Sequence, residues 1–354
     1  MPRLVPTEPR ASAAPVASAA ATRAARGSWR DQLRAAIRDP DELIDRLGLP
    51  DVLRGPAREA ARAFGLVAPE AFVARMRHGD PRDPLLAQVL PIGEELAPAP
   101  PSYVADPCGD TAALRAPGLL QKYRGRALLI VTGVCAVACR YCFRREFPYA
   151  DGPGGLSEWQ PALDVLRDSR DVEEVLLSGG DPLMRPDDWL ADLVARLESI
   201  PHLRRLRIHT RLPIVIPDRV DDALLGWLRA TRLAPTVVVH SNHPDELDEA
   251  CSEAMLRLVK SGVPVLNQTV LLRGVNDDAG TLTELSRRLL DARVMPYYLH
   301  QLDPVRGAQH WEVPVARGLE LVAELRRRLP GFGVPRYVRE VVGAAHKVEL
   351  GPEA

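Results

Sequence analysis

Three cysteines stand close together in the segment VTGVCAVACRYCFRREFPY, residues 131–149. Cys135, Cys139 and Cys142 follow an apolar run at spacings of four and three residues. Thiolates at such spacings hold zinc or an iron–sulfur cluster. Structural zinc usually takes four protein ligands from paired motifs, and the chain has no second close pair of cysteines. A histidine such as His209 or His240 could complete a zinc site, whereas a [4Fe–4S] cluster held by three thiolates leaves one iron open for another ligand.

The composition argues for a cytoplasmic protein without disulfides. Five cysteines in 354 residues are too few for a disulfide framework. Cys108 and Cys251 stand alone, and each is predicted to be a small buried apolar residue. The formal net charge of −1 and an aromatic content of 5% favour neither nucleic acid nor an anionic membrane as a partner. No apolar stretch is long enough to cross a bilayer.

The chain divides by composition into four parts. Residues 1–27 are rich in Ala, Pro, Ser and Arg, and we predict a disordered tail, with a transit peptide as the alternative. Helical periodicity from Ser28 to about residue 95, interrupted at Pro40, is followed by a proline-rich linker. Residues 28–120 are therefore predicted to form a helical region with its linker, residues 121–330 the main domain, and residues 331–354 a C-terminal segment.

Six short β-branched runs recur after residue 125, with amphipathic helical patterns between them. The runs cover residues 127–133, 173–179, 205–210, 235–241, 263–269 and 294–300. Strand followed by helix at this spacing is typical of βα units with parallel strands. Six units in an α/β fold favour a partial (β/α)6 barrel, and periodicity alone does not exclude a doubly wound open sheet. Both folds gather functional groups at the carboxyl ends of the strands.

Longer motifs resemble those of one enzyme family. CAVACRYC is similar to the CxxxCxxC motif of the radical S-adenosylmethionine (SAM) enzymes, whose open iron binds SAM and whose cluster cleaves it to a 5′-deoxyadenosyl radical. The segments KYRGRALLIVTGVCAVACRYCFRREFPY, LSGGDPLM, RLRIHTRLPIVIP, NQTVLLRGVND and MPYYLH together resemble lysine 2,3-aminomutases. They most closely resemble the short bacterial form that makes (R)-β-lysine for modifying elongation factor P. The resemblance runs from about Trp29 to the end of the chain.

This resemblance implies three cofactors and the residues that hold them. Cys135, Cys139 and Cys142 would hold a [4Fe–4S] cluster. Pyridoxal 5′-phosphate (PLP) would be bound covalently by Lys347, which lies in REVVGAAHKVELGP, a stretch that matches a more glycine-rich one in the family. The other two PLP contacts implied are Lys122 and Tyr123.

SAM and substrate contacts are implied in the same way. SAM would be bound by Gly179, Gly180, Asp181, His240 and Gln268. From the sequence alone, SGGDPL could equally be a turn in which Asp181 caps the next helix.

Three charged residues are implied for the amino-acid substrate. Arg144 would bind its carboxylate, with Arg145 as the neighbouring competitor. Asp303 and Glu340 would bind its side-chain ammonium, an arrangement that favours lysine over glutamate and leaves arginine open on charge.

The resemblance thus predicts an L-lysine 2,3-aminomutase that supplies (R)-β-lysine for elongation factor P. Its implied partners are L-lysine, an electron donor such as flavodoxin or ferredoxin, and the ligase that attaches β-lysine to elongation factor P. The alternatives are a producer of free β-lysine for another pathway, an arginine 2,3-aminomutase, and a non-catalytic iron–sulfur or zinc protein. A nucleic-acid-modifying radical enzyme is disfavoured by the near-neutral charge and by the lack of an appended basic domain.

Overall fold

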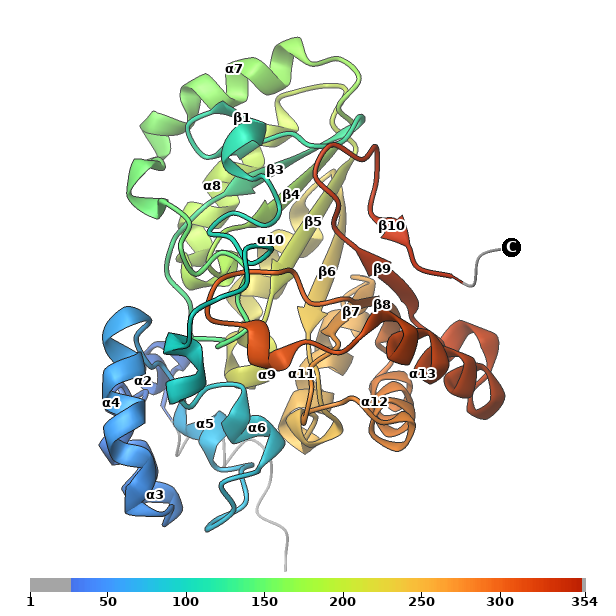
Figure 1. Ribbon diagram of the computed structural model, residues 1–354. Coiled ribbons are helices and arrows are strands. Elements are labelled where there is room, and N and C mark those ends of the chain that lie inside the picture. Colours follow the sequence, from blue (N-terminus) through green and yellow to red (C-terminus); the bar gives the residue numbers. More distant parts are fainter. Residues whose placement is uncertain (1–26, 352–354) are drawn as a thin grey trace, which may run out of the picture.

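The computed structural model describes residues 27–351 (Figure 1). The tail predicted at residues 1–27 lies outside the described residues except for Gly27. The strands are β1 (Leu114–Ala116), β2 (Leu119–Leu120), β3 (Arg126–Ile130), β4 (Glu174–Ser178), β5 (Arg205–Thr210), β6 (Ala234–His240), β7 (Val265–Val270), β8 (Met295–His300), β9 (Arg336–Arg339) and β10 (Val348–Glu349). The α-helices are α2 (Trp29–Arg34), α3 (Pro40–Leu47), α4 (Arg54–Ala63), α5 (Glu70–Val73), α6 (Pro84–Ala87), α7 (Gln160–Asp168), α8 (Asp187–Glu198), α9 (Leu212–Val215), α10 (Asp222–Ala230), α11 (Glu249–Lys260), α12 (Ala279–Asp291) and α13 (Val315–Arg328).

One sheet runs through the described residues, and its strands are hydrogen-bonded in chain order from β1 to β10. Strands β3 to β8 pair in parallel, as in the pairs Ile130–Ser178 and Val270–His300. A doubly wound sheet reverses its strand order at a switch point, and this order never reverses. The α/β fold with a partial barrel is therefore confirmed, and the doubly wound alternative is not.

All six predicted strands are present within a few residues of their predicted bounds. The sheet is nevertheless wider than six strands. Strands β1 and β2 add antiparallel pairs before β3, and β9 continues in parallel beyond β8. Because β9 has only four residues and β10 two, neither shows a period in the sequence. The C-terminal segment predicted at residues 331–354 is thus joined to the sheet rather than appended to it.

The parallel strands and their helices share a core because each strand alternates its faces. In β4, Val175 and Leu177 are fully buried in the core, whereas Leu176 lines the cavity described below. In α8, Leu190, Leu193 and Leu197 recur at helical spacing and are fully buried. In Figure 1, α7, α8, α10, α11, α12 and α13 lie along the outside of the sheet. No helix between residues 27 and 351 is long and apolar enough to span a membrane.

The N-terminal region confirms the predicted run of short helices, with α2 ending before Pro40 and α3 beginning there. Helices α2 to α6 gather at one corner of the molecule (blue in Figure 1). This region supports the cysteine segment directly. The Val67 carbonyl accepts a hydrogen bond from Ala138 N (3.0 Å), and the Gln88 carbonyl accepts one from Arg140 N (3.0 Å).

Glu95 makes the strongest link between the N-terminal region and the cysteine segment. Its buried carboxylate accepts two hydrogen bonds from Arg140, at 2.8 and 2.7 Å, and one from Arg145 at 2.8 Å. The Glu95 side chain is only 1% exposed, and that of Arg140 is fully buried. Arginine and carboxylate fit each other in this two-bond geometry, and burial makes each partner dependent on the other.

Replacing Glu95 by alanine leaves two buried guanidinium groups without their anion. We expect Glu95→Ala to lower the free energy of unfolding by about 3–5 kcal/mol. Denaturant unfolding followed by circular dichroism measures this. Glu320→Ala is the matched control, because Glu320 pairs with Arg317 at the surface and should cost less than about 1 kcal/mol. Equal losses in the two variants would contradict the role given to Glu95.

Candidate active site

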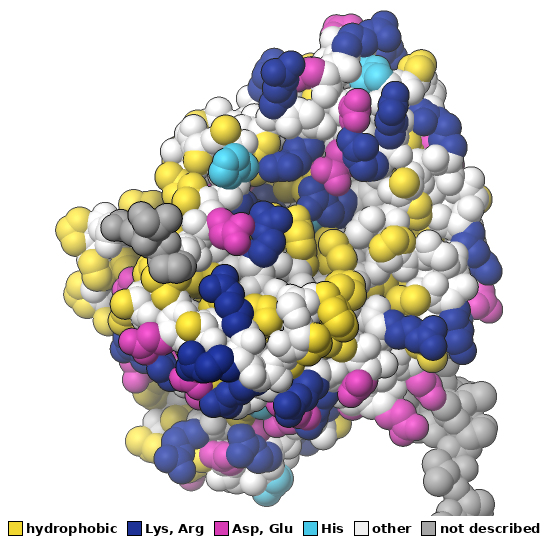
Figure 2. All heavy atoms as spheres, turned by 90° about the vertical axis from the view of Figure 1, so that its right-hand side faces the viewer, with side chains coloured by type: hydrophobic (Ala, Val, Ile, Leu, Met, Phe, Trp, Pro, Cys, Tyr) yellow, Lys and Arg dark blue, Asp and Glu magenta, His cyan; other side chains and the backbone are white. Residues whose placement is uncertain are grey.

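Every residue predicted to hold a cofactor or substrate lines one cavity of about 310 Å³. Contributions come from β3, β4, β5, β6, β7 and β8 and from the loops that follow them. Figure 2 shows the right-hand face of Figure 1, where acidic and basic side chains are interspersed and a hollow is bordered mainly by basic and hydrophobic ones. The predicted residues in the cavity wall are Lys122, Tyr123, Cys135, Cys139, Cys142, Arg144, Gly179, Gly180, Asp181, His240, Gln268, Asp303, Glu340 and Lys347.

The three clustered cysteines are free thiols on a tight loop after β3. Cys142 N donates to the Cys139 carbonyl at 3.0 Å, which closes a turn between two of them. Burial raises the pKa of Cys142 to about 11, with a contribution from Cys139. Burial, and then the neighbouring Cys142, also raise the pKa of Cys135 well above its usual value. Thiols crowded in this way stay protonated unless they bind a cation. Such a group of thiols is typical of the ligands of a metal ion or an iron–sulfur cluster.

Two loops are in direct contact here. The loop after β4 that contains Ser178 to Asp181 (the SGGD loop) packs on the start of the loop that carries the three cysteines, residues 131–149 (the cysteine loop). Gly180 N donates to the Thr132 carbonyl (2.7 Å), and Asp181 N donates to the Val134 carbonyl (2.9 Å). Gly179 has φ +135°, and a Cβ there would lie 2.3 Å from the Thr132 oxygen. A Cβ at Gly180 would lie 2.5 Å from the Val134 oxygen. These glycines are therefore required by contact between two loops, a reason that the sequence did not suggest.

Asp181 is fully engaged by the protein itself. Its carboxylate accepts hydrogen bonds from the hydroxyl of Thr210 and from the backbone N–H groups of Leu183, Arg211 and Leu212. The helix-capping interpretation of SGGDPL therefore describes its contact with Leu183 N, at the start of a short 3-10 helix. The same carboxylate ties the loop after β4 to the loop after β5.

Arg144 and Lys122 are joined by Asp110, which sequence reasoning missed. Arg144 Nε donates to Asp110 Oδ2 at 2.6 Å, and Lys122 Nζ lies 2.5 Å from Asp110 Oδ1. Arg144 also donates to the Ser178 hydroxyl at 3.1 Å. Burial alone would raise the pKa of Asp110, but the charges of Arg144 and Lys122 hold it below its usual value. Asp110 and Ser178 thus hold Nε and Nη1 of the Arg144 guanidinium, which lines the cavity.

The C-terminal hairpin brings Lys347 and Glu340 together. Lys347 Nζ donates to Glu340 Oε2 at 2.5 Å, and the Tyr123 hydroxyl donates to Glu340 Oε1 at 2.6 Å. Burial would raise the pKa of Glu340, but the charge of Lys347 lowers it. Asp303 lies in the same wall, and burial raises its pKa to about 6 although Lys347 acts in the opposite direction. Two carboxylates and the terminal lysine therefore share one part of the cavity.

Comparison with known proteins identifies the family to which this chain belongs. The profile of the Radical SAM superfamily matches residues 129–285. The "L-lysine 2,3-aminomutase" of Escherichia coli (strain K12) is 46% identical over 92% of this chain and 95% of that protein. The "L-lysine 2,3-aminomutase" of Clostridium subterminale is 34% identical over 92% of this chain and 78% of that protein. The chain belongs to the lysine 2,3-aminomutase family of the radical SAM superfamily. A solved radical SAM methyltransferase from Sphaerobacter thermophilus is 19% identical over 62% of this chain and 68% of that one, with a TM-score of 0.47.

Membership of this radical SAM family makes the chain an isomerase that uses a [4Fe–4S] cluster and SAM. The donor set fits: three thiols from one loop line a cavity that has room for a further ligand. Within residues 27–351, no group of three or more His, Cys, Asp or Glu side chains is arranged to hold a single metal ion.

Three histidines that line this cavity have a ring nitrogen that forms no hydrogen bond with any described residue. The Nε2 atoms of His209, His240 and His300 are buried and have no hydrogen-bond partner between residues 27 and 351. They stand at or near the ends of β5, β6 and β8 and line the same cavity. Burial lowers the pKa of each, to about 4 for His240, so all three imidazoles are neutral at pH 7. Buried polar atoms without a partner in an enzyme cavity are the atoms that a bound ligand satisfies.

The two lone cysteines were predicted from the sequence to be small buried apolar residues. Both are buried, but their surroundings differ. Cys251 is fully buried on α11 within the core. Cys108 is also buried but lines the cavity, and its carbonyl accepts a hydrogen bond from Lys122 Nζ at 2.7 Å. No motif signals Cys108 or Asp110, because both lie in the irregular segment before β1.

The contact between the SGGD loop and the cysteine loop predicts the effect of one methyl group. Gly179→Ala places a Cβ against the Thr132 oxygen in a backbone conformation that alanine rarely adopts. We expect the variant to bind less than half of the wild-type iron and sulfide after anaerobic reconstitution. Gly226→Ala is the matched control, since nothing lies within 4 Å of a Cβ on this helical glycine. Full iron content in Gly179→Ala would show that the loops tolerate separation.

Proposed function

We propose that this chain converts L-lysine to (R)-β-lysine with the help of PLP, and that the product serves to modify elongation factor P. The observation that carries the proposal is the meeting of three groups in one cavity: the cysteine loop, the terminal Lys347, and the carboxylate pair of Asp303 and Glu340. An iron–sulfur protein without catalytic function has no need of the second and third groups.

Lys347 would hold PLP covalently through its amine, and when bound PLP carries the migrating nitrogen and delocalises the unpaired electron beside it. Lys122 would supply a cation for the PLP phosphate. Its ammonium is held in position by Asp110 and by the Cys108 carbonyl. Tyr123 orients Glu340 through its hydroxyl. Lys347 is more than 200 residues away from Lys122 and Tyr123 in the sequence. The hairpin of β9 and β10 must therefore form before these three side chains can act together.

The charges of the cavity suit an amino acid with a cationic side chain. Arg144 would bind the substrate carboxylate through its guanidinium, which Asp110 and Ser178 hold in position at Nε and Nη1. Asp303 and Glu340 would bind the side-chain ammonium, and both are partly buried, so each attracts a cation more strongly than it would in water. Similarity to proteins named L-lysine 2,3-aminomutase favours lysine. Arginine carries the same charge and remains the second candidate.

SAM would lie in the cavity, against the wall that the cysteine loop and the SGGD loop form together. His240 and Gln268 are register partners on β6 and β7, so they present their side chains at the same level. The neutral His240 ring offers its unsatisfied Nε2 to a ligand. Gly179 and Gly180 leave the wall free of side chains, and Asp181 contributes by holding the loop in place. Exclusion of water and a fixed orientation are what this chain supplies to the radical chemistry.

The cellular setting is part of the proposal. We place the enzyme in the cytoplasm, where its free thiols stay reduced. An electron donor such as flavodoxin or ferredoxin would reduce the cluster, and the ligase that attaches β-lysine to elongation factor P would use the product.

Incubation of the reconstituted, reduced enzyme with L-lysine tests this function. Chiral chromatography should show (R)-β-lysine, with L-arginine giving less than one tenth of the turnover. (S)-β-lysine as the product would refute the stereochemistry, and faster turnover of arginine would refute the substrate. A supply role is tested in vivo: deletion of the gene should remove β-lysine from elongation factor P.

The PLP assignment has a built-in control, because the chain has only three lysines, Lys122, Lys260 and Lys347. Lys347→Ala should abolish the visible absorbance of bound PLP and its shift on borohydride reduction. Lys260→Ala removes an exposed lysine at the end of α11 and should leave both unchanged. Retention of borohydride-trapped PLP in Lys347→Ala would place the cofactor elsewhere.

Asp303 predicts how substrate binding depends on pH. Its pKa of about 6 means that it is charged at pH 7 and becomes protonated as the pH falls through 6. Loss of this charge weakens attraction for an ammonium, so lysine affinity should fall below pH 6 by up to about tenfold per pH unit. Calorimetric titration between pH 5 and 8 measures this. L-norleucine, which lacks the side-chain ammonium, is the control and should show no such loss, and neither should lysine binding to Asp303→Asn.

A further inference from the structure

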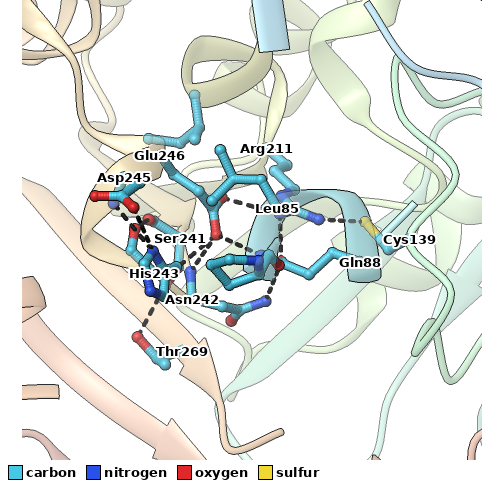
Figure 3. A network of polar contacts seen from close by, with 12 residues as sticks. Leu85, Gln88, Cys139, Arg211, Ser241, Asn242, His243, Asp245, Glu246 and Thr269 are labelled. Carbon is cyan, nitrogen blue, oxygen red and sulfur yellow. Dashed lines mark hydrogen bonds and ion pairs between the residues drawn. The ribbon is translucent and has the colours of Figure 1, made fainter. Parts of the chain in front are cut away.

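Arg211 is a buried arginine that touches a cluster ligand and has no part in the functions described so far. It follows the last residue of β5 and is 6% exposed. Its Nη1 donates to Cys139 Sγ at 2.8 Å and to the Tyr141 hydroxyl at 2.7 Å. Figure 3 shows the guanidinium lying between the cysteine and a group of polar side chains from other elements. It lies in RLRIHTRLPIVIP, one of the segments that resemble the family, but the sequence gave it no role of its own.

The other side of the guanidinium is equally fixed. Its Nη2 donates to Glu246 Oε2 at 2.9 Å and to Gln88 Oε1 at 2.7 Å. Glu246 is fully buried, and its other oxygen accepts from Asn242 N at 2.9 Å and from Gln88 Nε2 at 3.1 Å. Asn242 in turn donates to Gln88 Oε1 and to the Tyr141 hydroxyl. Arg211 therefore has no other rotamer available without breaking a buried ion pair.

We propose that Arg211 sets the reduction potential of the cluster through its hydrogen bond to Cys139 Sγ, and that Glu246 limits the size of this effect. When Cys139 binds iron, its sulfur is a thiolate. A hydrogen bond from a cation stabilises negative charge on that sulfur, and the reduced cluster carries one more negative charge than the oxidised one. Arg211 thus favours the reduced cluster, while the anionic Glu246 opposes it. The inference rests on the cluster that the family implies and is independent of the substrate and of PLP.

The arrangement also explains why the network reaches the N-terminal region. Gln88 follows α6, and its side chain contacts both Arg211 and Glu246, while its carbonyl accepts from Arg140 in the cysteine loop. The Arg211 guanidinium, which donates to Cys139, is therefore fixed by Gln88 after α6, by Glu246 after β6 and by Tyr141 in the cysteine loop. A donor fixed in this way keeps its distance from the sulfur when ligands enter or leave the cavity.

The test is the midpoint potential of the reconstituted cluster, measured by redox titration with electron paramagnetic resonance in the absence of SAM and lysine. Arg211→Gln removes the charge and should shift the potential to more negative values, so that less cluster is reduced at a given poise. Glu246→Gln removes the opposing anion and should shift it in the other direction. Arg211→Lys keeps the charge without the two-sided fork and should fall between Arg211→Gln and the wild type.

Arg219→Gln is the matched control. Arg219 is fully buried and donates to the Leu183 carbonyl and to Asp187, away from the thiols. Its replacement should leave the potential unchanged. Iron and sulfide content is measured on every variant, and if Arg211→Gln does not hold a full cluster, the opposite shift expected for Glu246→Gln still decides. Unchanged potentials in fully loaded Arg211→Gln and Glu246→Gln would overturn the proposal. So would weaker SAM binding at unchanged potential, because Arg211 would then be a SAM ligand.

Discussion

The parallel order of β3 to β8 is the constraint on which the site depends. Parallel strands that follow one another in a sheet present all their carboxyl ends at one edge, so the residues after each strand meet. The register makes this concrete: Ile130 stands beside Ser178, and His240 beside Gln268. Segments that are widely separated in the chain thus form one wall. Reversing the direction of one of these strands would move the residues after it to the opposite edge of the sheet.

The second requirement is that each buried charge has a partner. Burying an isolated ion costs several kcal/mol, and the loss is avoided only by pairing. In this wall the arginines after β3 and β5 are paired with carboxylates from other parts of the chain. Glu95 and Asp110 come from the N-terminal region and the segment after it, and Glu246 follows β6. The N-terminal region therefore supports the active site from behind, because its Glu95 holds Arg140 and Arg145 in the cysteine loop. Asp110 and Glu246 hold the cations that line the cavity itself.

The sequence alone predicted the elements that carry a period and the residues that carry a motif. The six parallel strands were visible because each is a run of at least five residues that is either apolar or alternates apolar with polar residues, with amphipathic helical patterns between the runs. The three cysteines were visible through their spacing. Asp110 and Arg211 were not, because a partner chosen across the fold leaves no local trace, and this chain has many arginines and aspartates. The short β9 and β10 were missed because pairing makes them strands, β9 with β8 and β10 with β9, and neither carries an intrinsic pattern.

The hairpin of β9 and β10 shows how register can join two functions. Val348 pairs with Arg339, so the next pair toward the loop is Lys347 with Glu340. Gly343, with φ +81°, allows the loop between them to turn. In the protein without ligands the Lys347 ammonium occupies the carboxylate of Glu340. On the proposed assignment Lys347 would hold PLP through its amine, and Glu340 would then be available to the substrate ammonium. The hairpin register therefore places the lysine that would hold the cofactor beside a carboxylate that would bind the substrate.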